Sequence, residues 1–145
     1  MNHLALLLAA ATVAAAGIVT GGTAAAADLA VSVGPVRDAA GQVKVVLYDR
    51  PDAFRKEAQS RAIQTVPAVP GMVEVVFRDL PAGTYAIMAY HDEDASGDLN
   101  RFLGMIPTEG YALSNDPEVT GPPSFEASAF ALPAAGSKLK LSLRY

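Results

Sequence analysis

The feature of this sequence that most constrains its fold is a two-residue alternation of apolar and polar side chains. It is clearest near the end of the chain, where Leu139, Leu141 and Leu143 alternate with Lys138, Lys140, Ser142 and Arg144. Successive side chains of a β-strand point to opposite faces, so this pattern predicts a strand with one buried face and one wet face. The same alternation in residues 42–48 and 72–80 predicts two more strands of this kind.

Three further strands are predicted at residues 29–33, 61–69 and 84–90, which are rich in β-formers and bounded by Gly, Pro or Asp. Residues 84–90 are apolar on both faces apart from Thr84, which is typical of a strand in the centre of its sheet. Turn signals at residues 38–41 and 70–71 predict hairpins that join the first two strands and the next two.

Residues 51–58 predict a short crossover helix, because Pro51 stands at its first position and Phe54 and Ala58 lie four residues apart. Residues 92–122 show neither the strand nor the helix period, and their many apolar side chains predict a long loop that folds back as a cap. Short strands without a βαβ rhythm predict an all-β fold. We expect an immunoglobulin-like or transthyretin-like β-sandwich of about seven strands, with one short helix and a long capping loop.

The first 27 residues contain no Lys, Arg, Asp or Glu, and residues 4–19 form an apolar run of signal-peptide length. Small residues just before Asp28 match a cleavage pattern, so we expect a signal peptide at 1–27 and a single domain at 28–145. An uncleaved anchor is the alternative, although the run is short for a bilayer span. Because the chain has no cysteine, apolar packing must stabilise the fold, which favours the bacterial periplasm or secretion as its location.

The charge of the chain is concentrated in one segment. Residues 92–118 hold seven acids and a single base, Arg101, whereas the whole chain has a net charge of −4. An acidic surface without a basic stripe argues against nucleic acid as a partner, and no membrane span is expected after removal of the leader. The acidity points to a cation instead.

The acidic segment begins with oxygen-bearing side chains at every second position: Asp92, Asp94, Ser96, Asp98 and Asn100. These match the first, third, fifth, seventh and ninth positions of an EF-hand loop, and Gly97 matches its sixth. Leu103 replaces the bidentate Glu at the twelfth position, so the affinity should be weaker unless Glu109, Glu93 or another group folds back to complete the shell. We predict a weak Ca²⁺ site. The alternative is a metal-free acidic turn in which the side-chain oxygens accept hydrogen bonds from backbone N–H groups.

Two other kinds of chemistry are weaker alternatives. With no cysteine and one histidine after the leader, His91, a zinc site would have to rely on carboxylates, and His91 fits a structural hydrogen-bonding role better than a catalytic one. A hydrolase acting on glycans or peptides would use two of the four carboxylates Asp92, Asp94, Asp98 and Glu109 as acid and base.

Short motifs in a fixed order resemble one known family. They are residues 80–87 (LPAGTYAI), 90–94 (YHDED), 97–100 (GDLN), 104–111 (GMIPTEGY), 114–115 (SN) and 123–125 (PSF). The chain resembles the exported bacterial proteins grouped as domain of unknown function family 2141, over nearly the whole predicted domain. The resemblance implies export and a small β-rich domain, and no activity.

The sequence therefore favours a non-enzymatic, exported binding or interaction module with a Ca²⁺-stabilised acidic loop. Its partner would be an unknown protein or a small-molecule ligand. Glu109, Tyr111 and Asn115 are expected to form a ligand-binding rim beside the loop, or else to serve only as turn and anchor residues. The hydrolase and a purely structural domain without metal remain the alternatives.

Overall fold

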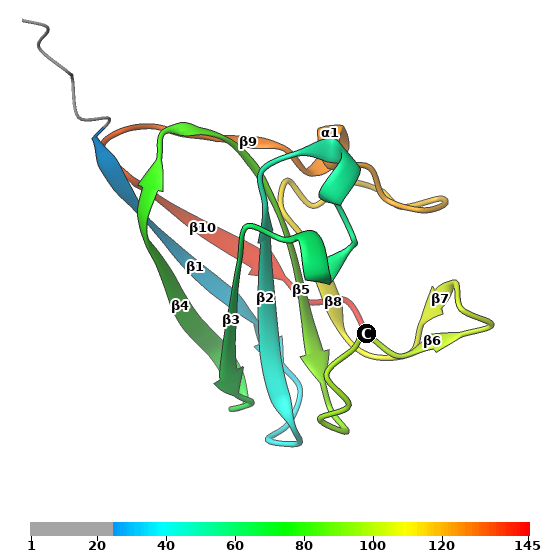
Figure 1. The fold of residues 1–145 in the computed structure, drawn as a ribbon. Helices are drawn as coiled ribbons and strands as arrows, with labels where there is room; N and C mark the ends of the chain where they lie inside the picture. The colour runs from blue at the N-terminus through cyan, green and yellow to red at the C-terminus, as the bar shows by residue number, and fades with distance from the viewer. Residues whose placement is uncertain (1–24) are drawn as a thin grey trace, which may run out of the picture.

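The alternating segments form two β-sheets packed face to face in the computed structural model, which describes residues 25–145 (Figure 1). The first sheet has the strand order β10–β1–β4, and the second has the order β3–β2–β5–β8, with β9 also pairing with β5. The strands of these sheets are β1 (Ala26–Val36), β2 (Gln42–Tyr48), β3 (Ala62–Pro67), β4 (Gly71–Pro81), β5 (Gly83–Asp92), β8 (Tyr111–Leu113), β9 (Phe130–Leu132) and β10 (Ser137–Ser142). The fold is an all-β sandwich, as the sequence predicted.

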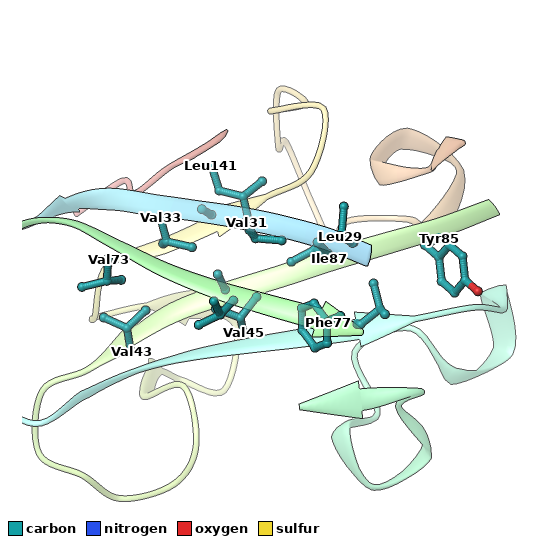
Figure 2. Packing of buried hydrophobic residues seen from close by; sticks show 14 of the residues in the cluster. Leu29, Val31, Val33, Val43, Val45, Val73, Phe77, Tyr85, Ile87 and Leu141 are labelled. Carbon is teal, nitrogen blue, oxygen red and sulfur yellow. The ribbon is translucent and has the colours of Figure 1, made fainter. Parts of the chain in front are cut away.

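The main core lies between the two sheets. It is built from the apolar halves of the alternating strands, including Val43, Val45 and Leu47 of β2 and Val75 and Phe77 of β4. Figure 2 shows Val31, Val45 and Phe77 between the ribbons of the two sheets. The predicted inward faces of β2, β4 and β10 are confirmed.

A second core covers the outer face of the five-stranded sheet. It contains Val46 and Tyr48 from β2, Met88 and Tyr90 from β5 and Leu113 from β8. They pack against residues that follow or connect these strands: Phe54, Leu99 and Phe125. Strand β5 is therefore buried on both faces, and it lies between β2 and β8. Its predicted central place is confirmed, and the second core positions the acidic segment against this sheet.

Neither predicted hairpin is present. Strand β1 pairs with β4 and, in parallel, with β10, whereas β2 pairs with β3 and β5. The turns at residues 38–41 and 70–71 therefore carry the chain from one sheet to the other. Each strand must bury its apolar face against the opposite sheet. The next strand along the chain can do this in either sheet, so the apolar pattern does not require it to form a hairpin with the strand before it.

The predicted helix at 51–58 is also wrong. Two 3₁₀ turns, Pro51–Ala53 and Glu57–Gln59, occupy this segment, and Arg55 between them has a left-handed backbone with φ of 66°. An α-helix cannot pass through such a residue. The short helix of the fold is α1 (Phe125–Ser128), which is capped by Ser124. No helix within residues 25–145 is long and apolar enough to cross a membrane.

The predicted capping loop has more structure than expected. Part of it is strand β8, and another part is a separate hairpin of β6 (Arg101–Phe102) and β7 (Ile106–Pro107), which projects from the sandwich (Figure 1). Four apolar side chains of this hairpin are exposed instead of forming a cap: Phe102, Leu103, Met105 and Ile106. Leu99 and Leu113, from the same segment, do pack in the second core.

The predicted signal peptide falls mostly on residues 1–24, which lie outside the described residues. Strand β1 begins at Ala26, and Ala27 is buried opposite Leu80 of β4. The first strand thus includes two residues on the leader side of the predicted cleavage point.

Candidate functional site

The acidic loop leaves the end of β5, on the five-stranded sheet. Asp92 is the last residue of β5 and pairs with Gln42 at the start of β2. The side chain of Leu99 is buried in the second core, which holds the far end of the loop against the sheet. Two side chains of the sheet, Lys44 and Tyr90, also contact the carbonyl oxygen of Gly97 at 2.8 and 3.0 Å. The loop is therefore fixed at its beginning, middle and end.

Asp92 is fully buried and organises the first half of the loop. Its Oδ1 accepts a hydrogen bond from the backbone N–H of Ser96 at 2.9 Å. Its Oδ2 accepts from the N–H of Gly97 at 2.9 Å and from Nε2 of Gln42 at 2.8 Å. These three donors satisfy a side chain that is fully buried, and they hold the loop around it.

Glu109 is also buried, and it ties the two sides of the loop together. Its Oε1 accepts from the N–H of Glu93 at 2.9 Å, and its Oε2 accepts from the N–H of Asn100 at 2.9 Å. The carbonyl oxygen of Asn100 in turn accepts from the N–H of Thr108 at 2.9 Å. Asn100 and Thr108 immediately precede and follow the β6–β7 hairpin, so Glu109 sits at the base of that hairpin.

Asp94 is exposed and lies next to these two buried acids. Its Oδ2 accepts from Nδ2 of Asn100 at 2.8 Å and its Oδ1 from the N–H of Ser96 at 3.1 Å. Hydrogen bonds from Asn100 and Ser96 hold the pKa of Asp94 below its usual value. Asp94 is therefore a carboxylate at neutral pH.

Carboxylate oxygens of Asp92, Asp94 and Glu109 all lie within 4.8 Å of one another. The ligands of one Ca²⁺ ion lie at 2.3–2.6 Å from it, so two of them are separated by at most about 5 Å. The three oxygens thus satisfy the distance requirement for a shared ion. Each oxygen of Asp94 and Glu109 accepts one hydrogen bond and keeps a second acceptor position.

The other three predicted ligands are placed differently. The Ser96 hydroxyl contacts Asp92 Oδ1 at 3.3 Å and the carbonyl of Asp98 at 3.1 Å, so it borders the group. The side-chain amide of Asn100 donates to Asp94. Asp98 does not belong to the group of three, and its side chain lines a pocket over the second core instead.

The predicted rim of Glu109, Tyr111 and Asn115 is used largely within the fold. Tyr111 pairs with Arg144 through two backbone hydrogen bonds and packs against the second core. Asn115, which has a left-handed backbone, donates from Nδ2 to the carbonyl of Ala129. These contacts agree with the anchor and turn roles, and Glu109 belongs to the acidic group.

His91 is buried and has a structural role. Its Nε2 lies 2.7 Å from the carbonyl oxygen of Ala40, and its Nδ1 lies 2.9 Å from the hydroxyl of Tyr145. Because a carbonyl only accepts, Nε2 carries a proton and donates it. Both ring nitrogens are engaged, so His91 acts as the hydrogen-bonding residue that the sequence predicted.

Burial divides the four acids of the hydrolase alternative into two pairs, because Asp92 and Glu109 are buried whereas Asp94 and Asp98 are exposed. Asp92 and Glu109 are both buried and accept backbone hydrogen bonds, so neither faces a substrate. A general acid or base must reach the proton that it transfers. Asp92 and Glu109 instead hold the loop through their hydrogen bonds to its backbone.

A second group of polar side chains lies on the outer face of the sheet and was not predicted from the sequence. Lys44 forms an ion pair with Glu57, and the Tyr90 hydroxyl lies 3.0 Å from the second oxygen of Glu57. Tyr48 lies beside them and is only 2 % exposed. The alternation of β2 places Lys44 and Tyr48 on one face, but their partner Glu57 comes from a segment that was predicted to be helical.

These tyrosines predict a loss of stability at alkaline pH. Burial, followed by the charge of Glu57, raises the pKa of Tyr48 to about 12, and burial with the Glu57 hydrogen bond raises the pKa of Tyr90 further. Since the folded pKa exceeds the unfolded value of about 10, the stabilisation is complete below pH 10 and lost as the pH rises toward 12.

Urea denaturation should show a lower midpoint at pH 11 than at pH 9. Tyr48→Phe should reduce this difference, and an equal drop in both proteins would contradict the assignment.

Fold and loop together define the class: a small all-β sandwich protein whose acidic loop gathers carboxylates at one end of the sheet. The chain belongs to the bacterial family described as "Uncharacterized protein conserved in bacteria (DUF2141)", whose sequence model matches residues 31–140. The resemblance noted in the sequence is thereby confirmed. No curated protein and no solved structure matches the chain.

Proposed function

We propose that this protein is an exported, non-enzymatic binding module in which Ca²⁺ stabilises the acidic loop. The carrying observation is the grouping of Asp92, Asp94 and Glu109, whose carboxylate oxygens lie within 4.8 Å of one another. Two of these acids are buried, and like charges held close together repel. A divalent cation would relieve this repulsion and use the acceptor positions that Asp94 and Glu109 keep.

The ion would act on the neighbouring hairpin. Glu109 and Asn100 join the two sides of its base, and the ladder continues through the pairs Arg101–Pro107 and Phe102–Ile106. An ion on Glu109 would therefore restrict how the hairpin moves. The exposed apolar side chains of this hairpin support a binding role, because exposed apolar patches of this kind mark interaction sites.

Export is supported by the uncharged apolar segment at residues 1–27 and by the absence of cysteine. The periplasm would also suit a weak site, since extracellular Ca²⁺ modules operate at roughly 10⁻⁴ to 10⁻³ M. Protein recovered from a periplasmic fraction, with its mass measured to locate the processing point, is the material for the calcium experiment.

Calcium should raise the melting temperature of the protein. With a Kd of roughly 10⁻⁴ to 10⁻³ M, Ca²⁺ at about 10 mM stabilises the fold by about 1.4 to 2.7 kcal/mol. For a domain of this size, this corresponds to an increase of at least about 4 °C, which EGTA should reverse. Titration calorimetry should show saturable heat in the same concentration range.

Two variants separate specific binding from general charge effects. Asp94→Asn removes a carboxylate from an exposed position, so the fold should persist. Its affinity for Ca²⁺ should be at least about tenfold lower. Glu118→Gln makes the same change of charge at an exposed acid outside the group and should bind Ca²⁺ like the original protein. Equal responses from the two variants, or no response in the original protein, would disprove the calcium site.

A further inference from the structure

A pocket on the outer face of the five-stranded sheet has the features of a separate ligand site. It lies over the second core, and residues from the 3₁₀ segment and from the end of the acidic loop form its walls. Its floor is apolar, with Val46, Met88 and Leu99. Its volume is about 100 Å³, which restricts the bound group to a few heavy atoms.

Two arginines line this pocket without a carboxylate partner. Neither Arg55 nor Arg101 forms an ion pair within residues 25–145, although the chain is acidic and most other arginines there are paired. Arg101 is the only base among the seven acids of residues 92–118, and its Nη1 donates to the carbonyl of Leu99 at 3.2 Å. Arg55 is held in a left-handed backbone conformation, which is strained for a residue with a Cβ.

A tyrosine hydroxyl that is open to the pocket supplies a third donor. Tyr48 is 2 % exposed, and its hydroxyl has no hydrogen-bond partner among the described residues, although it borders the pocket. The charges of Arg55 and Arg101 both act on this hydroxyl, lowering its pKa against the larger effect of burial. Because burial dominates, the hydroxyl keeps its proton and is available as a donor.

The acids of the pocket limit the charge of its ligand. Glu57 is neutralised by its ion pair with Lys44 and is also in contact with the Tyr90 hydroxyl, which leaves exposed Asp98 at the edge. The two free arginines and one free acid leave about one positive charge. A monoanion matches this charge, whereas a dianion such as phosphate would be repelled by the two acids.

We propose that this pocket binds a small aliphatic monocarboxylate. Its carboxylate lies between the guanidinium groups of Arg55 and Arg101 and accepts a hydrogen bond from Tyr48, and its short apolar stem contacts Met88. Guanidinium groups suit this task because their planar donors match the two oxygens of a carboxylate. The site is separate from the acidic group and does not depend on the calcium proposal.

Butyrate is the probe for this site. In NMR titrations of the protein, the methyl signal of Met88 should shift saturably with butyrate at millimolar concentration. Butyramide, which has the same shape without the charge, should cause no saturable shift, and phosphate should bind more weakly than butyrate. Binding of phosphate alone would indicate a general anion site and overturn the monocarboxylate assignment.

Arg55→Gly is the most informative variant, because glycine favours the left-handed backbone found at this position and the fold should not suffer. Its melting temperature should be unchanged or higher, while its affinity for butyrate falls at least about tenfold. Arg50→Gln is the matched control, since Arg50 pairs with Asp52 outside the pocket, and it should bind butyrate normally. Equal affinities of the two variants, or no shift of Met88 with butyrate, would overturn the proposal.

Discussion

Replacing Asp92 by alanine is expected to lower the free energy of unfolding by about 2 kcal/mol or more. The carboxylate is fully buried and accepts hydrogen bonds from Ser96, Gly97 and Gln42. Alanine would leave the N–H of Gly97 and Nε2 of Gln42 without an acceptor, whereas the N–H of Ser96 keeps Oδ1 of Asp94. Each unsatisfied buried donor costs about 1–3 kcal/mol. Relief of the repulsion from Glu109 offsets part of this loss. Urea denaturation followed by circular dichroism measures the difference.

Asp92→Asn is the control for this prediction. The amide has nearly the same shape as the carboxylate but presents an NH₂ group to one set of donors. Asp92→Asn should therefore lower the free energy of unfolding less than Asp92→Ala does, and more than Asp94→Asn does at the exposed acid. This order follows from the number of donors that keep an acceptor. A loss below about 1 kcal/mol for Asp92→Ala would show that the carboxylate does not hold the loop.

The second large effect is expected for Gly41→Ala, in the connection between the two sheets. Gly41 has φ of 65°, and a Cβ there would lie 1.9 Å from the carbonyl oxygen of Asp92 and 2.7 Å from that of Glu93. Both obstacles are backbone atoms at the end of β5, so the strand itself would have to move. The expected loss is about 3 kcal/mol or more, with a weaker response to Ca²⁺, because the displaced atoms belong to the acidic loop.

Gly71→Ala separates the two causes of this loss. Gly71 also has a positive φ, 100°, but a Cβ there would meet no atom within 4 Å. Gly71→Ala should therefore lower the free energy of unfolding only by the cost of placing a Cβ on a left-handed backbone, about 1–2 kcal/mol. Urea denaturation measures both free energies of unfolding. An equal loss in Gly41→Ala and Gly71→Ala would show that the close approach of Gly41 to β5 does not affect stability.

The sequence predicted the faces of the strands well because the two-residue period is local. Val43, Val45 and Leu47 point inward for the same reason as Leu139 and Leu141. Strand pairing could not be predicted, because a Pro-Gly turn has the same sequence whether it closes a hairpin or crosses between sheets. The parallel pairing of β1 with β10 has no local signal at all.

The predictions of a helix at 51–58 and of a capping loop both depended on features that residue type does not determine. The predicted helix fails at Arg55, whose left-handed conformation is not encoded by its residue type. The predicted cap is formed only in part. Leu99 and Leu113 pack in the second core, whereas Leu103 and Met105 are 73 % and 75 % exposed, because apolar side chains are not always buried.

The candidate site could be predicted only in part. The spacing of Asp92 and Asp94 identified the acidic loop, and the missing twelfth ligand suggested Glu109. Asp98 leaves the group because the loop turns its side chain toward the second core. The pocket of Tyr48, Arg55 and Arg101 draws on three distant segments, and the lone base in an acidic stretch was the one signal that pointed to it.

The position of β1 between β10 and β4 has a consequence for biosynthesis. Leu29 pairs with Ser137 and Val33 with Leu141, so one edge of β1 stays open until translation reaches the far end of the sandwich. A nascent chain in this state exposes unpaired backbone groups and cannot complete its three-stranded sheet. Such long-range pairing is intrinsically slow, which gives chaperones time to engage the chain before the sheet closes.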